Sequence, residues 1–475
     1  PQRGRRISTS RTSRTRPIRC TLPLCTGTRG PMLCLLLAPA ALAAPTGAAL
    51  IYCDPVGYEG RYFREACEAR GVLLVRLWST PYAAMLSEDL EDAEERAAIQ
   101  RGCAPAAGEE AAWAESALSG MAITGVLCGS DAGLATAERL QHALVPARTN
   151  GLVPARRDKY LMHEALRTAG LAAARQSVVR SWEEARSFLS TLPPPLRVVL
   201  KPRRGHAGLR VGLASSEPQA RHMVETLLAE RVSLDTEAEG GALCQEVLEG
   251  EEWVVDTVSR AGEHKCVALW RYGKGEANGA PFVNFYDELR PCAGEGEERL
   301  VRYALAVLDT LGWRWGPAHI EVKQTSRGPV LVEVNAGRFN GVDFGLLADV
   351  CVGHNAYDVT LDAYFDQAAW AALPALPPRA LRGAGRLVKL VASEEGVLRA
   401  AALPPAGLES LVRWGPEPSE PGEPVALTVD NNSCAGYAWL LHADEAVVAA
   451  DCAALHELQA AGRLFDVDSA SGAES

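Results

Sequence analysis

Two runs of alternating polar and apolar residues, separated by a short turn, constrain the fold of this chain more than any other stretch. They lie within GPAHIEVKQTSRGPVLVEVNAGRFNG, residues 316–341, as AHIEVK (318–323) and VLVEVN (330–335). Alternation with a period of two is typical of a strand with one buried face, and the intervening QTSRG has the small and polar residues of a turn. The stretch therefore predicts a β-hairpin.

The expected register of this hairpin brings two acidic side chains together. If the turn is centred on Arg327, Glu321 lies opposite Glu333 and His319 lies opposite Asn335, all on one face. Two carboxylates in direct opposition destabilise a sheet unless positive charge lies between them, and a divalent cation with oxygen ligands would supply that charge. A solvated hairpin face with scattered charges fits the same pattern, and a one-residue slip in register would separate the carboxylates.

The composition limits the class of protein and its partners. The 475 residues are enough for two or three domains, and 48% hydrophobic with 23% charged residues is ordinary for a globular protein. A net charge of −11 argues against nucleic acid as the main partner. The 13 cysteines form no CxxC pair, so we expect free thiols in a reducing compartment. The longest apolar run, 32–44, contains Pro39 and is too short for a membrane span.

Residues 1–47 differ in character from the rest of the chain. They contain eight arginines before Gly30, and the first acidic residue is Asp54. This pattern is typical of an organelle transit segment, whereas the MLCLLL run that starts at Met32 resembles the apolar core of a signal segment. A disordered tail without a targeting function fits equally well. The expected location is therefore cytoplasmic or organellar, and we leave this segment out of the fold.

The globular part begins with alternating strands and helices. Apolar runs at 49–53, 72–77 and 123–128 predict buried strands, and residues 60–70 predict a helix between the first two. This β–α–β alternation predicts an α/β fold with a doubly wound, Rossmann-like sheet. No GxGxxG motif follows the first strand, so we expect a structural or substrate-binding role rather than dinucleotide binding.

A second region contains lysines in contexts that suit phosphate binding. Residues 157–170 predict a helix with Asp158 near its N-terminus. Residues 198–200 predict a strand that runs into the loop KPRRGHAG, with 211–213 pairing back. A basic, glycine-containing loop can bend over phosphates and offer backbone N–H donors together with the charge of Lys201. An ordinary hairpin turn explains the same residues.

The remaining elements are expected mainly as strands. The periodicity predicts strands on both sides of Gly250 and at 264–270, a helix at 300–311, and, after a proline-rich linker, short strands with a final helix at 452–461.

These segments, in this order, resemble the ATP-grasp superfamily. The resemblance is carried by a lysine on a helix, a strand Lys-Pro with a small-residue loop, the QEVLEGEE segment and the EVN end of the hairpin. It is closest to the amino-acid ligase branch, through QEVLEGEEWVVDTVSRAGEH, WRYGKGEANG and GPAHIEV. The resemblance implies a Rossmann-like domain over 48–150, an α+β ATP-grasp domain over 151–375 with a lid at 190–260, and a small β-rich C-terminal subdomain over 376–475.

The resemblance also implies roles for individual residues in binding Mg²⁺ and ATP. Phosphate contacts are implied for Lys159 and Lys201, adenine contacts for the backbone of Glu246 and Leu248, ribose contacts for Glu252, and magnesium ligation for Glu321, Glu333 and Asn335. Each of these residues could instead be an ordinary solvated or strand-edge residue. His206 and His319 are expected to be packed or exposed rather than catalytic.

The sequence departs from the family at one position. The family usually has an arginine two residues after the metal-binding asparagine, but here that position is Gly337 and the arginine is Arg338. A local bulge could bring Arg338 to the same place, next to the transferred phosphate or the substrate carboxylate. Arg338 is therefore the candidate catalytic residue.

By this resemblance, the protein is expected to be an ATP-dependent ligase of the amino-acid or dipeptide type, which activates a carboxylate as an acyl phosphate and joins it to an amine. ATP and Mg²⁺ are the implied cofactors, and small carboxylates and amines are the implied partners. A carboxylase or purine-pathway ligase is the alternative enzyme, although no biotinyl-lysine motif is visible. A non-catalytic ATP-binding protein is the third alternative. The pattern leaves the substrates and a homodimer open.

Overall fold

The predicted hairpin lies at the edge of a large antiparallel sheet. In the computed structural model, which describes residues 47–55, 57–79, 102–131, 133–205, 210–229, 240–339 and 347–469, the hairpin consists of β11 (Gly316–Thr325) and β12 (Gly328–Ala336). The eight strands of this sheet are ordered β12-β11-β8-β9-β10-β13-β17-β15. The other six are β8 (Glu251–Arg260), β9 (Glu263–Ala277), β10 (Ala280–Arg290), β13 (Ala384–Lys389), β15 (Leu411–Pro416) and β17 (Gly436–His442).

The expected register is confirmed, but its cause differs from the expected one. Glu321 pairs with Glu333, and His319 pairs with Asn335. The turn has only two residues between the paired Thr325 and Gly328, which by itself would set Glu321 opposite Val332. A bulge between the Glu321 and Val322 pairs adds one residue on β12, and this extra residue brings the two carboxylates into opposition.

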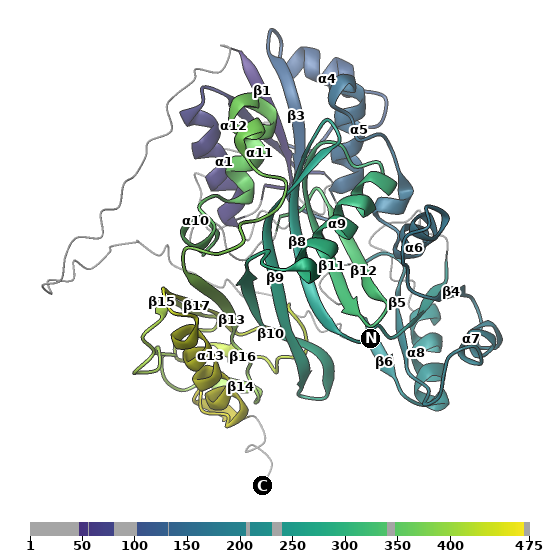
Figure 1. Ribbon diagram of the computed structural model, residues 1–475, viewed down its shortest axis with the longest axis vertical. Coiled ribbons are helices and arrows are strands. Elements are labelled where there is room, and N and C mark those ends of the chain that lie inside the picture. The colour runs from purple at the N-terminus through teal and green to yellow at the C-terminus, as the bar shows by residue number, and fades with distance from the viewer. Residues whose placement is uncertain are drawn as a thin grey trace, which may run out of the picture.

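The N-terminal region is a parallel sheet with helices around it. Its strands β1 (Ala48–Cys53), β2 (Leu73–Leu77) and β3 (Ala122–Cys128) are ordered β2-β1-β3. The helices are α1 (Gly57–Ala69), α4 (Glu110–Ala117) and α5 (Leu134–Leu144). Two helices from much later in the chain, α11 (Ala356–Phe365) and α12 (Gln367–Ala372), return to this region, and α11 lies beside α1 (Figure 1). The predicted parallel α/β sheet is confirmed.

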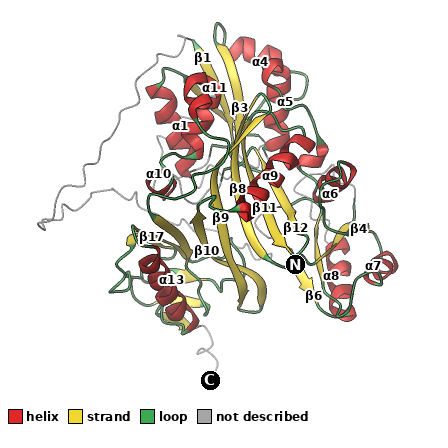
Figure 2. Cartoon of the chain, viewed as in Figure 1, coloured by secondary structure: helices red, strands yellow, loops and turns green. Residues whose placement is uncertain are grey.

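A smaller antiparallel sheet lies beside the hairpin. Its strands β4 (Gln176–Val179), β5 (Val198–Pro202), β6 (Gly212–Ala214) and β7 (Ala242–Glu246) are ordered β4-β7-β5-β6. Helices α7 (Trp182–Leu189) and α8 (Glu217–Ala229) pack on it through a separate apolar core, and α6 (Lys159–Thr168) precedes it (Figure 2). β5 and β6 pair as predicted. β7 and β8 follow each other in sequence but belong to different sheets, so residues 247–250 connect the two sheets.

The C-terminal region continues the large sheet. β13 pairs with β10, and β17 pairs with β13, so three C-terminal strands extend the sheet that contains the hairpin. A small sheet of β14 (Gly396–Leu398), β16 (Pro424–Val425) and β18 (Val467–Ser469) lies alongside, and α13 (Glu445–Ala460) packs on β13 and β17. The final helix starts at Glu445, about two turns earlier than the expected residue 452, because Asp444 caps it. The domain boundaries stay a prediction.

Several sequence expectations concern cysteines, membranes and the terminal segment. Ten cysteines lie in the described part of the chain, and all ten are free. Among the described helices, none combines the length and apolar character needed to cross a membrane. The targeting interpretations fall on residues 1–46, which lie outside the described residues, as does His206.

Candidate functional site

Two lysines from different elements meet the hairpin at Glu333. Lys159 is the first residue of α6, and its Nζ lies 2.7 Å from Glu333 Oε2 and donates to the Gly205 carbonyl at 2.9 Å. Lys201 lies on β5 and is 4% exposed. Burial lowers the pKa of Lys201 to about 8, and the neighbouring charge of Lys159 acts in the same direction. The site is therefore rich in positive charge at the point where phosphates are expected.

The local sequence holds Lys159 in place. Asp158 caps α6 by accepting hydrogen bonds from the N–H groups of Tyr160 and Leu161, and it also pairs with Arg203 at 2.6 Å. The Lys159 N–H donates to the Arg203 carbonyl at 2.9 Å. Burial opposes the charged form of Lys159, but the carboxylate of Glu333 outweighs it and raises the pKa of Lys159. The start of α6 and the end of β5 are thus joined as one unit.

Glu252, on the strand that pairs with the hairpin, is neutralised by lysines from two strands. It is buried on β8, contacts the ammonium of Lys274 on β9, and lies 3.1 Å from Lys323 on β11. Burial alone would raise the pKa of Glu252, but Lys274 and Lys323 lower it to about 2. Lys274 also lies 3.7 Å from Glu321, so it links Glu252 to the hairpin carboxylates.

Glu246 at the end of β7 is held by two arginines. Its carboxylate accepts from the Arg175 N–H and Nε, both at 3.0 Å, and from Arg327 Nη2 at 2.6 Å. The Glu246 N–H donates to the Arg175 carbonyl at 2.9 Å. Because Arg327 is in the hairpin turn, this contact ties the small sheet to the tip of the large one. Leu248 follows in the connection between the sheets and is half-buried.

These groups follow one another along the hairpin. Glu321 and Glu333 lie opposite each other, Lys323 beside Glu252 comes two residues closer to the tip, and Arg327 with Glu246 is at the tip. Two residues of a strand advance about 7 Å. The residues matched by sequence to the phosphates, ribose and adenine therefore occur in the order in which those parts are joined in ATP.

A buried polar network, which sequence reasoning missed, lies beside the hairpin carboxylates on the same face of the sheet. His319 Nδ1 lies 2.8 Å from Asp256 Oδ1, and its Nε2 lies 3.3 Å from the Tyr272 hydroxyl and 3.7 Å from Glu321. Asp256 also accepts from Trp270 Nε1 at 2.8 Å. Burial opposes the charged imidazole, but the carboxylates of Asp256 and Glu321 raise the pKa of His319 to about 10. His319 is thus packed, as expected, although in charged form.

Arg338 reaches its position through a turn rather than the expected bulge. β12 ends at Ala336, Gly337 has φ +78°, and the Arg338 N–H donates to the Asn335 carbonyl at 3.3 Å. A positive φ at the third residue of a four-residue turn favours glycine, which accounts for the inserted Gly337. The Arg338 guanidinium lies 3.6 Å from Asp131, beyond the carboxyl end of β3. The charge of Asp131 also raises the pKa of Lys159, so Arg338 borders the lysine-rich end of the site.

The residues around the opposed carboxylates have the chemistry of a magnesium site. Glu321, Glu333 and Asn335 offer oxygen donors on one face, and the lysines nearby supply the positive charge that the carboxylate pair requires. Within the described residues, no group of three His, Cys, Asp or Glu side chains has the arrangement of a metal site. A metal here would therefore rest on two carboxylates, one amide and oxygens of a phosphate, a set that suits Mg²⁺ bound together with a nucleotide.

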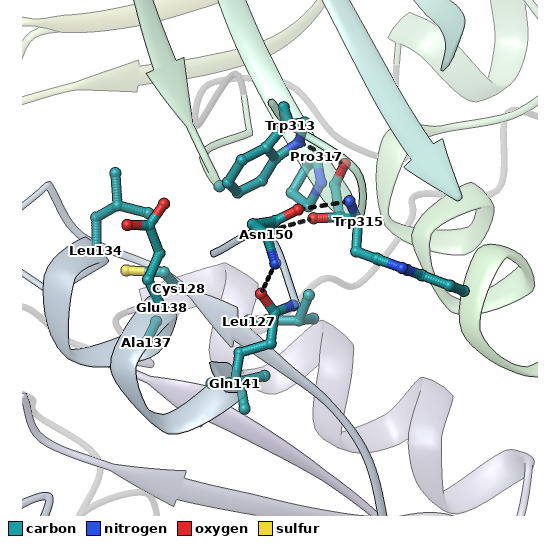
Figure 3. A pocket seen from close by; sticks show the side chains of 13 residues that line it. Leu127, Cys128, Leu134, Ala137, Glu138, Gln141, Asn150, Trp313, Trp315 and Pro317 are labelled. Carbon is teal, nitrogen blue, oxygen red and sulfur yellow. Dashed lines mark hydrogen bonds between the residues drawn. The ribbon is translucent and has the colours of Figure 1, made fainter. Parts of the chain in front are cut away.

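Asn150 fixes the start of the hairpin against the N-terminal sheet. Its Oδ1 accepts from the N–H groups of Arg314 and Trp315, both at 2.8 Å, and its Nδ2 donates to the Trp315 carbonyl at 2.9 Å. Its own N–H donates to Gln141 of α5 at 3.0 Å. Asn150, Gln141 and Trp315 border a small cavity of about 20 Å³, room for about one water, between α5 and the segment that leads into β11 (Figure 3).

Sequence reasoning assigned no role to five residues of this site: Lys274, Lys323, Asp256, Arg175 and Arg327. The alternation of β9 and β11 could have found the lysines, because Lys274 shares a strand face with Tyr272, and Lys323 shares one with Glu321. No local pattern predicts the arginines, whose partner Glu246 lies 71 and 81 residues away.

Comparison with known proteins identifies an ATP-grasp domain within the chain. Residues 194–344 match the sequence model of the ATP-grasp domain. Dapdiamide A synthase of Enterobacter agglomerans is 34% identical over 242 residues, which are 50% of this chain and 56% of that enzyme. The match thus spans little more than half the length of this relative.

Solved structures share the fold at low sequence identity. An L-amino acid ligase from Bacillus licheniformis has a TM-score of 0.65 and 14% identity, over 90% of this chain and 99% of that one. A phosphoribosylglycinamide synthetase from Anaerococcus prevotii has a TM-score of 0.57 and 14% identity, over 89% and 99%. At such identity these structures establish the fold alone. The domain match itself supports the predicted resemblance: residues 194–344 carry an ATP-grasp domain.

Proposed function

We propose that the protein is an ATP-dependent carboxylate–amine ligase of the amino-acid ligase type. One observation carries the proposal: the residues assigned to phosphate, ribose and adenine contact successive positions of one hairpin in that order, at Glu333, Lys323 and Arg327. The relationship to dapdiamide A synthase favours the amino-acid ligase branch. The shared fold with a purine-pathway enzyme does not decide between branches, because a fold hosts many substrates.

The reaction has two steps. A carboxylate oxygen of the first substrate attacks the γ-phosphorus of ATP, the bond to the β-phosphate oxygen breaks, and ADP leaves. The amine of the second substrate then attacks the acyl carbon, the bond to the phosphate oxygen breaks, and inorganic phosphate leaves while the nitrogen loses a proton to solvent. Catalysis in such a site comes mainly from positioning and electrostatic stabilisation, because negative charge gathers on the transferring group.

The roles of the chain's own residues follow from their charges. Lys159 and Lys201 would neutralise the phosphates, and Arg338 would contact the transferring phosphoryl group or the substrate carboxylate. Glu321, Glu333 and Asn335 would hold Mg²⁺, which would offset the negative charge of the phosphates. On nucleotide binding, Lys159 would exchange its contact with Glu333 for the phosphates.

The nucleoside end of the site would use residues near the tip of the hairpin. Glu252 would take the ribose hydroxyls. The Glu246 N–H already donates to Arg175, so adenine recognition falls to the Glu246 carbonyl and the Leu248 backbone. The Glu246 side chain would position this segment through its arginines rather than touch the base.

Glu333→Gln tests the proposal. ADP release in the presence of Mg²⁺-ATP and pooled amino acids should fall by about 100-fold or more, because one unit of charge is lost where the metal would bind. Without nucleotide, the thermal midpoint should fall, because Lys159 loses its charged partner. If only the opposition of Glu321 and Glu333 mattered, the midpoint would rise instead, because their repulsion would be relieved. Glu251→Gln, on the same sheet but 58% exposed, is the matched control and should change neither value. Wild-type ADP release by Glu333→Gln would overturn the metal assignment.

A further inference from the structure

A second buried polar cluster lies on the large sheet, three strands from the hairpin carboxylates. It consists of Asn284 and Asp287 on β10 and Lys389 on β13. Asn284 Nδ2 donates to Asp287 Oδ1 at 2.7 Å, and Lys389 Nζ lies 3.2 Å from Asp287 Oδ2. A bulge in the β9–β10 pairing between Asn284 and Tyr286 places Asn284 and Asp287 on one face although they are three residues apart.

This cluster faces the same side of the sheet as the candidate nucleotide site. Asp287 pairs with Tyr272 in register, and Tyr272 pairs with Glu252. Cross-strand partners lie on one face, and the Tyr272 hydroxyl contacts His319 at 3.3 Å. The cluster is as buried as the nucleotide residues: Asn284 is 3%, Asp287 1% and Lys389 5% exposed, compared with 4% for Lys201 and 7% for Glu252.

Two acceptor atoms of the cluster have no hydrogen-bond donor in the part of the chain that the structure describes. Among the described residues, neither Asn284 Oδ1 nor Asp287 Oδ2 has a hydrogen-bond partner, since the Lys389 contact is an ion pair without hydrogen-bond geometry. Flipping the Asn284 amide would set its oxygen against the Asp287 carboxylate, so the orientation is fixed by charge. Buried acceptors without donors cost free energy, and such exceptions in a folded protein call for a ligand or another partner.

We propose that Asn284, Asp287 and Lys389 bind the charged head group of an α-amino-acid substrate. The ammonium would donate to the two oxygens that lack partners, and the carboxylate of the same head group would meet Lys389. This subsite rests on the proposed ligase function. Three strand spacings, about 14 Å across the sheet, and a two-residue offset in register, about 7 Å along the strands, separate it from Glu321. The metal, the γ-phosphoryl group and the reacting carboxylate would fill part of that interval.

Asp287→Asn is the main test, with Glu288→Gln as the matched control. Asp287→Asn keeps the shape and the Oδ1 acceptor but turns the other oxygen into a donor that repels an ammonium. Glu288 is the next residue on β10, faces the opposite side, and pairs there with Arg271 and Arg386. Both variants lose one buried charge, so a merely structural role affects both alike, through stability.

The readouts are the KM for each substrate and the thermal midpoint. In the first assay, each of the twenty L-amino acids is supplied with Mg²⁺-ATP and hydroxylamine, which takes the place of the amine substrate and gives a hydroxamate. In the second assay, the amino acids are supplied in pairs with Mg²⁺-ATP and without hydroxylamine. We expect the KM for one amino acid to rise about 10- to 100-fold in Asp287→Asn, with the KM for ATP within twofold and both unchanged in Glu288→Gln. If the KM rises in the hydroxylamine assay, the subsite binds the amino acid that supplies the carboxylate. If the KM rises only in the assay with pairs, the subsite binds the amino acid that supplies the amine.

Two further arms keep the outcomes separate. Asn284→Leu, which removes the Oδ1 acceptor, should reproduce the KM effect if Asp287→Asn does not fold. Wild-type KM values in both variants would overturn the subsite while leaving the ligase function intact. If the wild-type protein releases no ADP with any pair, the ligase proposal fails instead. Calorimetric titration of the same amino acids in Mg²⁺-ADP then decides the subsite: binding lost in Asp287→Asn supports it, and no binding to the wild type contradicts it.

Discussion

At the residue scale, burial decides the charge of the side chains around the candidate site. Lys201, His319 and His163 are all nearly inaccessible, yet their pKa values move in different ways. His319 faces carboxylates and stays charged. His163, on α6, has no facing carboxylate strong enough to offset burial, which together with the charge of Lys201 lowers its pKa to about 3. Neighbouring charge, rather than depth alone, therefore sets the protonation state.

His163 predicts a loss of stability in acid. Its folded pKa lies below the unfolded value near 6.5, so below pH 6.5 the unfolded chain binds a proton that the folded chain does not. The contribution is present above pH 6.5 and is lost as the pH falls towards 3. At pH 5 the free energy of unfolding should be about 2 kcal/mol lower than at neutral pH through this residue.

The measurement is denaturant unfolding at pH 7 and pH 5 for the wild type and His163→Gln. The variant, which has no group to titrate here, should lose about 2 kcal/mol less than the wild type over this interval. His222 on α8 is exposed, so His222→Gln serves as the control and should show the same pH dependence as the wild type. Equal pH dependence in His163→Gln and the wild type would show that His163 is protonated in the fold.

At the element scale, two contacts between distant segments position the hairpin. At its tip, Arg327 joins the turn to Glu246 and hence to the connection between the two sheets. At its base, Asn150 joins the segment entering β11 to α5. The hairpin itself is local in sequence, but both of its ends are set by non-local hydrogen bonds.

Arg327→Ala should weaken nucleotide binding more than it weakens the fold. Losing the 2.6 Å contact frees the Glu246–Leu248 segment that we assign to adenine, so the KM for ATP should rise about tenfold with a small change in kcat. Arg197→Ala, which removes an exposed pair with Glu249 in the same connection, is the matched control and should have little effect. A wild-type KM for ATP in Arg327→Ala would contradict the positioning role.

Asn150→Ala should act on stability instead. It leaves the N–H groups of Arg314 and Trp315 and the Trp315 carbonyl without their partner, in a buried region, at a cost of about 2 to 4 kcal/mol. Chemical denaturation measures this loss. The KM for ATP should stay near the wild-type value, and a loss below about 0.5 kcal/mol would show that water replaces the amide without penalty.

At the scale of the whole molecule, the candidate nucleotide site is shared between the two antiparallel sheets. Lys201 comes from the small sheet, Glu321 and Glu333 come from the large one, and α6 lies between them. Arg338, from the loop after β12, reaches the carboxyl edge of the N-terminal sheet at Asp131. A ligand in this position would therefore contact three parts of the fold at once.

Mg²⁺-ATP should consequently stabilise the whole chain. A ligand that binds only the folded state at 100 times its Kd raises the free energy of unfolding by about 2.7 kcal/mol. Thermal unfolding with and without Mg²⁺-ATP measures the effect, and Mg²⁺ alone is the control. Lys201→Ala should reduce the shift, because a positive charge facing the phosphates is lost. An undiminished shift in that variant would contradict the phosphate-binding assignment of Lys201.

Local pattern was sufficient for much of the fold. Period-two alternation located β11 and β12, apolar runs located β1 and β3, and the pairing of Glu321 with Glu333 followed from counting across the turn. These features depend on residues near one another in the chain, where side-chain periodicity and turn chemistry act directly. Counting residues across the turn gave the correct pair for the wrong reason, because the turn is shorter than assumed and a bulge in β12 adds one residue.

The sequence by itself determined the resemblance to the ATP-grasp domain, the parallel N-terminal sheet, the hairpin and the candidate ligands on it. Only the tertiary structure decided which charges compensate them: Lys159 for Glu333, Lys274 for Glu252, Asp256 for His319 and Arg327 for Glu246. It also decided that the C-terminal strands extend the large sheet and bring Lys389 to Asp287. The physical reason is that periodicity specifies which face a side chain occupies, whereas a buried charge is neutralised by whichever partner the folded chain brings within a few ångströms, at any distance in sequence.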